Sequence, residues 1–121
     1  MIRRGDICWI DLGQPAGSGP AHRRLIVVVS DDEFNRSRIS TVIGVVCTTN
    51  LRLADAPGNV MLHEEESGLP YDSVVNVSQV ITVDKAELTE PPVGAVGLPS
   101  MRHIEDGLRL VLGMTPPLQR W

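Results

Sequence analysis

The sequence predicts a mainly β protein, a small twisted barrel of antiparallel strands that ends in one α-helix. Six or so short apolar runs, separated by turn residues, fill the chain up to residue 96, and helical spacing appears only after residue 100. Hydrophobic residues make up 42% of the 121 residues, enough for a core without disulfides or metal. We therefore expect one domain over residues 1–121.

The strands are expected where runs rich in β-branched residues are bounded by Gly, Pro, Asn, Asp or Ser: residues 6–12, 24–30, 41–48, 59–62, 73–83 and 93–96. The run at 24–30 is the most apolar in the chain, which is typical of a strand buried on both faces. Polar interruptions near Ser78 predict a bend in the strand at 73–83. The ten residues of 13–22 hold three glycines and two prolines and predict a long loop.

Short turns and one helix complete the prediction. Asp31 or Asp32 is expected to cap a short helical turn. Residues 50–58 are expected to form a loop, residues 63–68 an acidic turn, and residues 84–88 a second helical turn. The closing helix is expected to start at a Ser100 cap and to end at Gly113. Its apolar stripe consists of Met101, Ile104, Leu108 and Val111, and Arg102, Glu105, Asp106 and Arg109 lie on the opposite side.

Charge is distributed unevenly along the chain. The net charge of −4 argues against a general nucleic-acid binder. Residues 1–52, however, carry seven arginines against five acids, whereas residues 53–121 carry four basic residues against ten acids. Any anion site is therefore expected in the first half. Aromatic residues make up only 3%, which leaves no extended base-stacking platform within one chain.

Several features predict a cytoplasmic protein without a membrane segment. No apolar run approaches the length of a membrane span, and the polar start lacks the apolar core of a signal peptide. Cys8 and Cys47 both fall inside predicted strands, where they are expected to be small buried hydrophobes in a reducing compartment.

The strongest candidate site lies where two predicted strands meet. If 24–30 and 41–48 pair as antiparallel neighbours, the start of the first lies beside the end of the second. Arg24 and Thr48 would then share one edge of the core, where a guanidinium and a hydroxyl can grip a phosphate. The alternative is that Arg24 pairs with an acid at 31–33 on the surface and that Thr48 is an ordinary strand residue.

Other chemistries have weaker support. His22, His63 and His103 are too scattered for a zinc site, and the glycines of 13–19 match neither dinucleotide nor P-loop spacing. Nothing in the sequence lowers the pKa of Cys47, as a thiol nucleophile would require. No metal and no cofactor are expected.

Five short motifs follow one another in the chain: RGDICWIDL at residues 4–12, Gly17-Ser18 followed by RRLIVVVSDD at 23–32, VCTTN at 46–50, GNV at 58–60 and DSVVNV at 72–77. In this order and spacing, with the C-terminal helix, they resemble the MazF/PemK family of toxin endoribonucleases over nearly the whole chain.

The resemblance implies an SH3-like barrel related to the plasmid toxin CcdB, working as a homodimer, and an antitoxin peptide, MazE-like, as its partner. It also implies sequence-specific, metal-independent cleavage of single-stranded RNA to a 2′,3′-cyclic phosphate and a 5′-hydroxyl. The matching positions make Arg24 and Thr48 the catalytic residues. The RNA-binding residues implied in the same way are Gly17, Ser18, His22, Thr49 and Gln79.

The chain departs from the family pattern at two places, which bear on the RNA sequence that is cleaved. Leu25 stands where the family usually has proline. Ser78-Gln79 is followed by Val80-Ile81, where many members have an acid before the glutamine and an arginine or lysine shortly after it. The alternative function, from another class, is a non-enzymatic CcdB-like toxin that binds DNA gyrase. Such a protein needs no phosphate grip and would use the end of its C-terminal helix.

Overall fold

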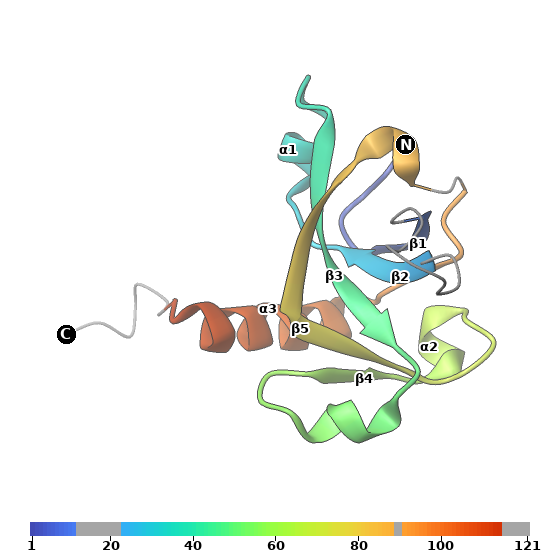
Figure 1. Cartoon of the computed structure of the whole chain (residues 1–121), viewed down its shortest axis with the longest axis vertical. Coiled ribbons are helices and arrows are strands. Elements are labelled where there is room, and N and C mark those ends of the chain that lie inside the picture. The colour runs from blue at the N-terminus through green and yellow to red at the C-terminus, as the bar shows by residue number, and fades with distance from the viewer. Residues whose placement is uncertain (12–22, 89–90, 115–121) are drawn as a thin grey trace, which may run out of the picture.

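The computed structural model describes residues 1–11, 23–88 and 91–114. Its strands are β1 (Asp6–Asp11), β2 (Arg23–Val28), β3 (Thr41–Thr48), β4 (Val60–Leu62), β5 (Ser73–Asp84) and β6 (Gly94–Ala95). Its helices are α1 (Asp32–Asn35), α2 (Glu64–Ser67) and α3 (Leu98–Leu112), with 3₁₀ turns η1 (Leu51–Asp55) and η2 (Lys85–Glu87) (Figure 1). The strand at 41–48 agrees residue for residue with its prediction, and the other strands agree to within a few residues.

The described strands form one antiparallel sheet in the order β4-β5-β3-β2-β1-β6. The sheet curves until α2, which follows the edge strand β4, packs against the opposite edge strand β6 (Figure 1). A side chain at Gly94 would collide with the carbonyl oxygen of Ser67, so only glycine permits this close approach. The fold is thus a partly closed barrel with a C-terminal helix, which confirms the predicted fold class.

Alternating residues of the central strands enter two separate cores. The first core contains Leu25, Val27 and Cys47, and α3 covers it with Met101 and Ile104. The second core lies on the other face of β1, β2 and β3 and consists of Ile2, Cys8, Ile10, Ile26, Val28, Val42, Val46, Val83 and Leu88. The central strands are therefore buried on both faces, as the apolar run at 24–30 predicts.

The predicted bend near Ser78 is a register shift between β3 and β5. Val45 pairs with Val80, but the next residue, Val46, pairs with Asn76. Residues 77–79 are therefore extra on the β5 side, as in a bulge, which bends the strand and increases its twist. The shift separates the half of β3 near Thr48 from the half near Thr41.

Helix α3 begins earlier than its sequence suggests. Gly97 is the N-cap, and the predicted cap Ser100 lies inside the first turn, so that prediction is wrong. The Ser100 hydroxyl instead donates to Glu66 Oε2 at 3.1 Å, a contact across 34 residues. The helix ends before Gly113, as predicted. No helix in the described part of the chain is long and apolar enough to cross a membrane.

Two of the short helical segments, α1 and η2, are capped by carboxylates. Asp31 Oδ2 accepts from the Glu33 amide at 2.9 Å and caps α1, as predicted. Asp84 Oδ1 accepts from the Ala86 amide at 2.9 Å and caps η2 in the same way. The predicted loop at 50–58 contains η1, and the predicted acidic turn at 63–68 contains α2.

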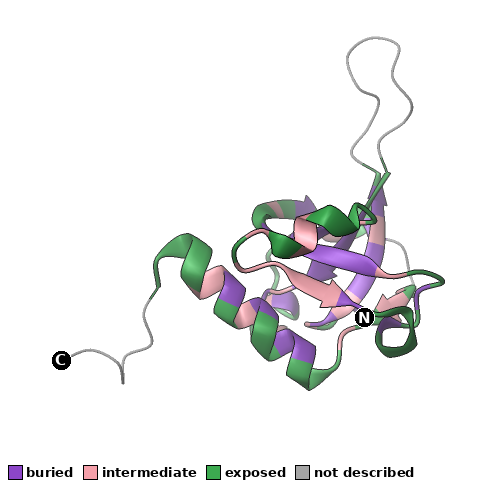
Figure 2. Cartoon of the chain, turned by 90° about the horizontal axis from the view of Figure 1, so that it is seen from below, coloured by how far each residue is buried: buried purple, intermediate pink, exposed green. Residues whose placement is uncertain are grey.

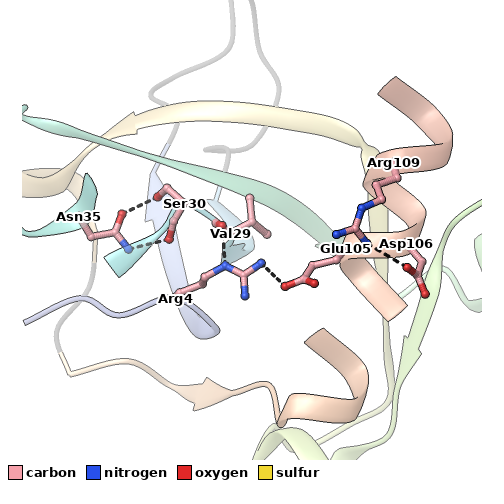
Figure 3. A network of polar contacts seen from close by, with 7 residues as sticks. All are labelled: Arg4, Val29, Ser30, Asn35, Glu105, Asp106 and Arg109. Carbon is pink, nitrogen blue, oxygen red and sulfur yellow. Dashed lines mark hydrogen bonds and ion pairs between the residues drawn. The ribbon is translucent and has the colours of Figure 1, made fainter. Parts of the chain in front are cut away.

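Arg4 connects the start of β1 with α3 (Figure 3). Its Nη2 lies 2.6 Å from Glu105 Oε2, and its Nε donates to the carbonyl oxygen of Val29 at 3.0 Å. Glu105 thus faces the protein rather than solvent. Next to this contact, the Ser30 hydroxyl donates to Asn35 Oδ1 at 2.5 Å. This network fixes α3 at the end of β2 that lies farthest from Arg24.

Candidate active site

The register of β2 and β3 brings Arg24 and Thr48 together. Ile26 pairs with Val46 and Leu25 pairs with Cys47. One residue further toward the strand ends, Arg24 of β2 therefore lies beside Thr48 of β3. Because side chains alternate along a strand, both share the face of Ile26 and Val46. The strand ends thus place a guanidinium and a hydroxyl side by side on rigid backbone.

Arg24 is exposed, and its side chain has no hydrogen bond or ion pair with any residue of the described ranges. Asp31 and Asp32 lie beyond the opposite end of β2 and have other partners there: Asp31 caps α1, and Asp32 Oδ1 accepts from the Arg4 amide at 2.7 Å. The alternative of a surface ion pair with these two acids is therefore not what the structure contains. Within the described ranges, no residue occupies the donors of the Arg24 guanidinium, which leaves them for a ligand.

The Thr48 side chain is held in place from one side. Its Oγ1 accepts a hydrogen bond from the Asn50 amide at 3.1 Å, and Asn50 in turn caps η1. Because the oxygen is already used as an acceptor by this amide, the hydroxyl hydrogen remains to be donated to a ligand.

A cavity of about 250 Å³ lies at these strand ends, between β1, β2, β3 and the start of β5. It is lined by Trp9, Arg23, Arg24, Leu25, Cys47, Thr48, Thr49, Tyr71 and Ser73. The guanidinium carbon of Arg23 lies 4.8 Å from the centre of the Trp9 ring, a cation–π distance. Two arginines and three hydroxyl-bearing residues of Ser or Thr type make this wall suitable for an anion.

A second cavity, of about 890 Å³, adjoins the first. The two share Thr49 and Tyr71, and the second is also lined by Leu51, His63, Glu64, Glu65, Pro70 and Asp72. Together they form a groove with arginines at one end and carboxylates at the other. At the acidic end, His63 Nδ1 lies 3.6 Å from Asp72 Oδ2.

The remaining predicted RNA-binding residues are placed differently. Thr49 lines both cavities. Gln79 is exposed on the bulge of β5, outside the lining of either cavity, and its Oε1 accepts from Asn76 Nδ2 at 3.0 Å. Asn76 pairs with Val46 and so lies two residue pairs from Thr48. Predicted residues Gly17, Ser18 and His22 lie outside the described residues.

Sequence reasoning missed three residues that line the first cavity. Trp9 could have been found, because strand alternation places it on the face opposite Cys8, next to Leu25 of β2. Tyr71 and Ser73 carry no local signal, since their position depends on how β5 pairs with β3 and β4.

Cys47 lines the cavity but is not suited to be a nucleophile. Burial raises the pKa of its thiol from the ordinary 9.0 to about 12, so the thiol stays protonated at neutral pH. Over residues 1–11, 23–88 and 91–114, the His, Cys, Asp and Glu side chains form no group of three arranged to hold a metal ion.

Comparisons with known proteins agree with this architecture. The family model described as "PemK-like, MazF-like toxin of type II toxin-antitoxin system" matches residues 3–112. Endoribonuclease MazF2 of Mycobacterium bovis and Endoribonuclease MazF6 of Mycobacterium tuberculosis are each 46% identical over 114 residues, which cover 94% of this chain and 99% of each relative.

Solved structures share the fold. An endoribonuclease from a mycobacterial species, in complex with its cognate antitoxin, superposes with a TM-score of 0.76 at 27% identity, over 97% of this chain and 100% of that chain. A MazE–MazF structure from Deinococcus radiodurans gives 0.77 at 18% identity, over 94% and 97% of the two chains, and supports the fold alone. With a family match over most of its length and relatives at 46% identity, the chain belongs to the PemK-like, MazF-like toxins of type II toxin–antitoxin systems.

Proposed function

We propose that this chain is a toxin that acts in the cytoplasm as a sequence-specific endoribonuclease on single-stranded messenger RNA. The observation that carries the proposal is the Arg24 guanidinium, unpaired among the described residues, which lies beside Thr48 at the wall of a cavity. The names of the 46% identical relatives, both endoribonucleases, support the same activity.

The proposed reaction is an internal transesterification. The 2′-oxygen of the RNA attacks the adjacent phosphorus, a P–O2′ bond forms, and the P–O5′ bond breaks. The 2′-hydroxyl loses its proton and the leaving 5′-oxygen gains one, which yields a 2′,3′-cyclic phosphate and a 5′-hydroxyl. Arg24 stabilises the negative charge of the phosphorane, and Thr48 donates a hydrogen bond to a non-bridging oxygen. A guanidinium holds its proton too tightly to be a good base, so its main role is electrostatic.

The reaction is proposed to need no metal ion. In metal-dependent nucleases a cation stabilises charge at the phosphorus and activates the nucleophile. Here Arg24 supplies the positive charge at phosphorus, and the nucleophile belongs to the RNA itself. Cleavage should therefore continue at full rate in EDTA.

The groove suits single-stranded RNA because it has separate surfaces for phosphate and base. The arginine end attracts the scissile phosphate, and the groove continues past Thr49 and Tyr71 into the larger cavity. Tyr71 is 37% exposed, so its ring is accessible to a base, and stacking on an aromatic ring requires an unpaired base. Gly17, Ser18 and His22 are proposed to line the RNA path, and Gln79 to read a base edge.

The antitoxin is proposed to compete with RNA for the same groove. Its cationic end, on a chain of net charge −4, fits an acidic and partly disordered segment. The mycobacterial endoribonuclease of similar fold was solved with its cognate antitoxin. A saturated toxin–antitoxin complex should therefore lose cleavage, and one that still cleaves at full rate would contradict competition.

A homodimer is proposed as the working form. The last turns of α3 extend beyond the sheet (Figures 1 and 2). Apolar side chains at this end of the helix and just after it are exposed: Leu110 62%, Leu112 57% and Met114 61%. Contact with a second copy would cover such apolar surface. Sedimentation at micromolar concentration should give a species of about twice 13.2 kDa, and a single monomeric species would count against the dimer.

The decisive experiment is to incubate the purified protein with a long RNA in EDTA and to map the new ends. Cuts at a recurring short sequence, with 2′,3′-cyclic phosphate and 5′-hydroxyl ends, are expected. The gyrase-binding alternative would use the exposed end of α3, so inhibition of DNA supercoiling by a protein that leaves RNA intact would favour it instead.

A further inference from the structure

Ser73, the first residue of β5, has a hydroxyl without a partner inside the candidate active site. The residue pairs with Leu62 of β4 and lines the 250 Å³ cavity together with Arg24 and Thr48. Its exposed fraction is 0%, and its Oγ has no hydrogen-bond partner in the described structure. A buried hydroxyl normally has one, because an unsatisfied polar group destabilises the fold.

The other buried serines of the described chain do have partners. Ser67 Oγ accepts from the Leu69 amide at 3.1 Å, Ser100 donates to Glu66, and Ser30 donates to Asn35. Ser73 is therefore the exception, and it is also the one of the four that lines the cavity with the two arginines. This coincidence indicates a hydroxyl whose partner is a ligand.

We infer that the Ser73 hydroxyl is a further substrate-binding donor, which hydrogen-bonds a phosphate oxygen of the RNA. The inference rests on the proposed function. The register that pairs Thr48 with Val74 puts Ser73 across from Thr49, and strand alternation places both on the face of Leu25 and Cys47, the face on which Arg23 lies over Trp9. Two arginines are among the residues that line the cavity, and a phosphate oxygen accepts several donors at once.

The buried position explains why this donor is kept ready in the free protein. Ser73 forms part of the cavity floor, and Val74 and Val75, which follow it in β5, are both fully buried. The hydroxyl is shielded from water, so a hydrogen bond to phosphate there competes less with solvent than one at the surface. Because Ser73 is fully buried, a phosphate oxygen reaches the hydroxyl only when side chains around the cavity move.

The test compares Ser73→Ala with Ser67→Ala, a matched change at a buried serine whose hydroxyl is already satisfied. Thermal melting is measured without RNA. Binding is measured with an oligonucleotide spanning a mapped cleavage site, with a 2′-deoxy sugar at the cut so that the nucleophile is absent. Single-turnover cleavage is then measured on the all-ribose RNA.

Ser73→Ala should melt at the wild-type temperature or a few degrees higher, because it removes an unsatisfied group, and should bind the deoxy-substituted RNA roughly 10- to 100-fold more weakly. Ser67→Ala should melt lower and bind normally. If Ser73→Ala binds and cleaves RNA like the wild type, or if its melting temperature falls like that of Ser67→Ala, the role of Ser73 is overturned. The proposed function would stand in either case. A wild-type protein that leaves RNA intact would overturn the proposed function along with it.

Discussion

Arg23 and Trp9 form a cation–π pair, with the guanidinium carbon 4.8 Å from the ring centre. The pair lies on the face of β2 that carries Leu25, whereas Arg24 shares the opposite face with Ile26. Two consecutive arginines thus have different surroundings: the first is held against an aromatic ring, and the second has no partner in the described structure. This difference makes Arg23 the internal control for Arg24.

Replacing Arg23 with alanine should weaken RNA binding and leave the chemical step intact. One fewer cation near the phosphates should lower the slope of log K against log salt by roughly 0.7 for a single strand. The single-turnover rate at saturating RNA should remain near wild type. Titrations at several salt concentrations, with the rate measured in parallel, check both; a rate as low as that of Arg24→Ala would remove the distinction.

Arg24→Ala should reduce single-turnover cleavage by at least about 10²–10³-fold, the usual effect of losing one aimed donor at a developing charge. Arg24→Lys should restore only part of the rate, since an ammonium lacks the planar fork of two donors. Circular dichroism should show an intact fold because the side chain is exposed. A folded Arg24→Ala that cuts at the wild-type rate would exclude the proposed mechanism, and an inactive His22→Ala beside it would favour a histidine base.

Thr48→Ala should cost less, roughly 3- to 10-fold in rate, because it removes one neutral hydrogen bond to the substrate. It also removes the acceptor of the Asn50 amide, so η1 should become less stable. Thr48→Ser keeps the hydroxyl and serves as the control in the same single-turnover assay. Equal loss in both variants would show that the methyl group, not the hydroxyl, matters.

The buried thiol of Cys47 makes the free energy of unfolding depend on pH in the alkaline range. Its pKa is about 12 in the folded state and 9.0 in the unfolded chain, so above pH 9 the unfolded state loses the proton first. The contribution is complete below pH 9 and falls as pH rises toward 12, by on the order of a few kcal/mol. Thermal melts between pH 8 and 11 should fall more steeply for wild type than for Cys47→Ala. Parallel curves would show that the thiol is not the group responsible.

The sequence was sufficient for most of the fold. Because the apolar run of β3 is bounded by polar residues at both ends, both limits of the strand, Thr41 and Thr48, could be predicted from the sequence. The start of α3 could not, because Ser100 in a local pattern resembles an N-cap, whereas its hydroxyl binds Glu66, 34 residues away. Local propensity does not contain such a contact.

The candidate site divides in the same way. Arg24 beside Thr48 follows from the pairing of two recognisable strands, so it was predictable. Ser73 was not, since a missing hydrogen bond is a property of the folded surroundings and leaves no mark on the sequence. Tyr71 likewise joins the two cavities only because the chain before β5 passes beside Thr49.

The end of α3 extends beyond the point where Gly107 contacts Gly58. A side chain at Gly107 would collide with the carbonyl oxygen of Gly58, so the helix rests there backbone against backbone. The helix continues to Leu112, roughly 7 Å beyond this contact. A force on the end of α3 would be transmitted to Gly58, which comes just before β4. Leu62 of β4 pairs with Ser73 of β5. A partner bound to the helix would thus be connected to the first cavity both through β4 and through the direct packing of α3 against β5.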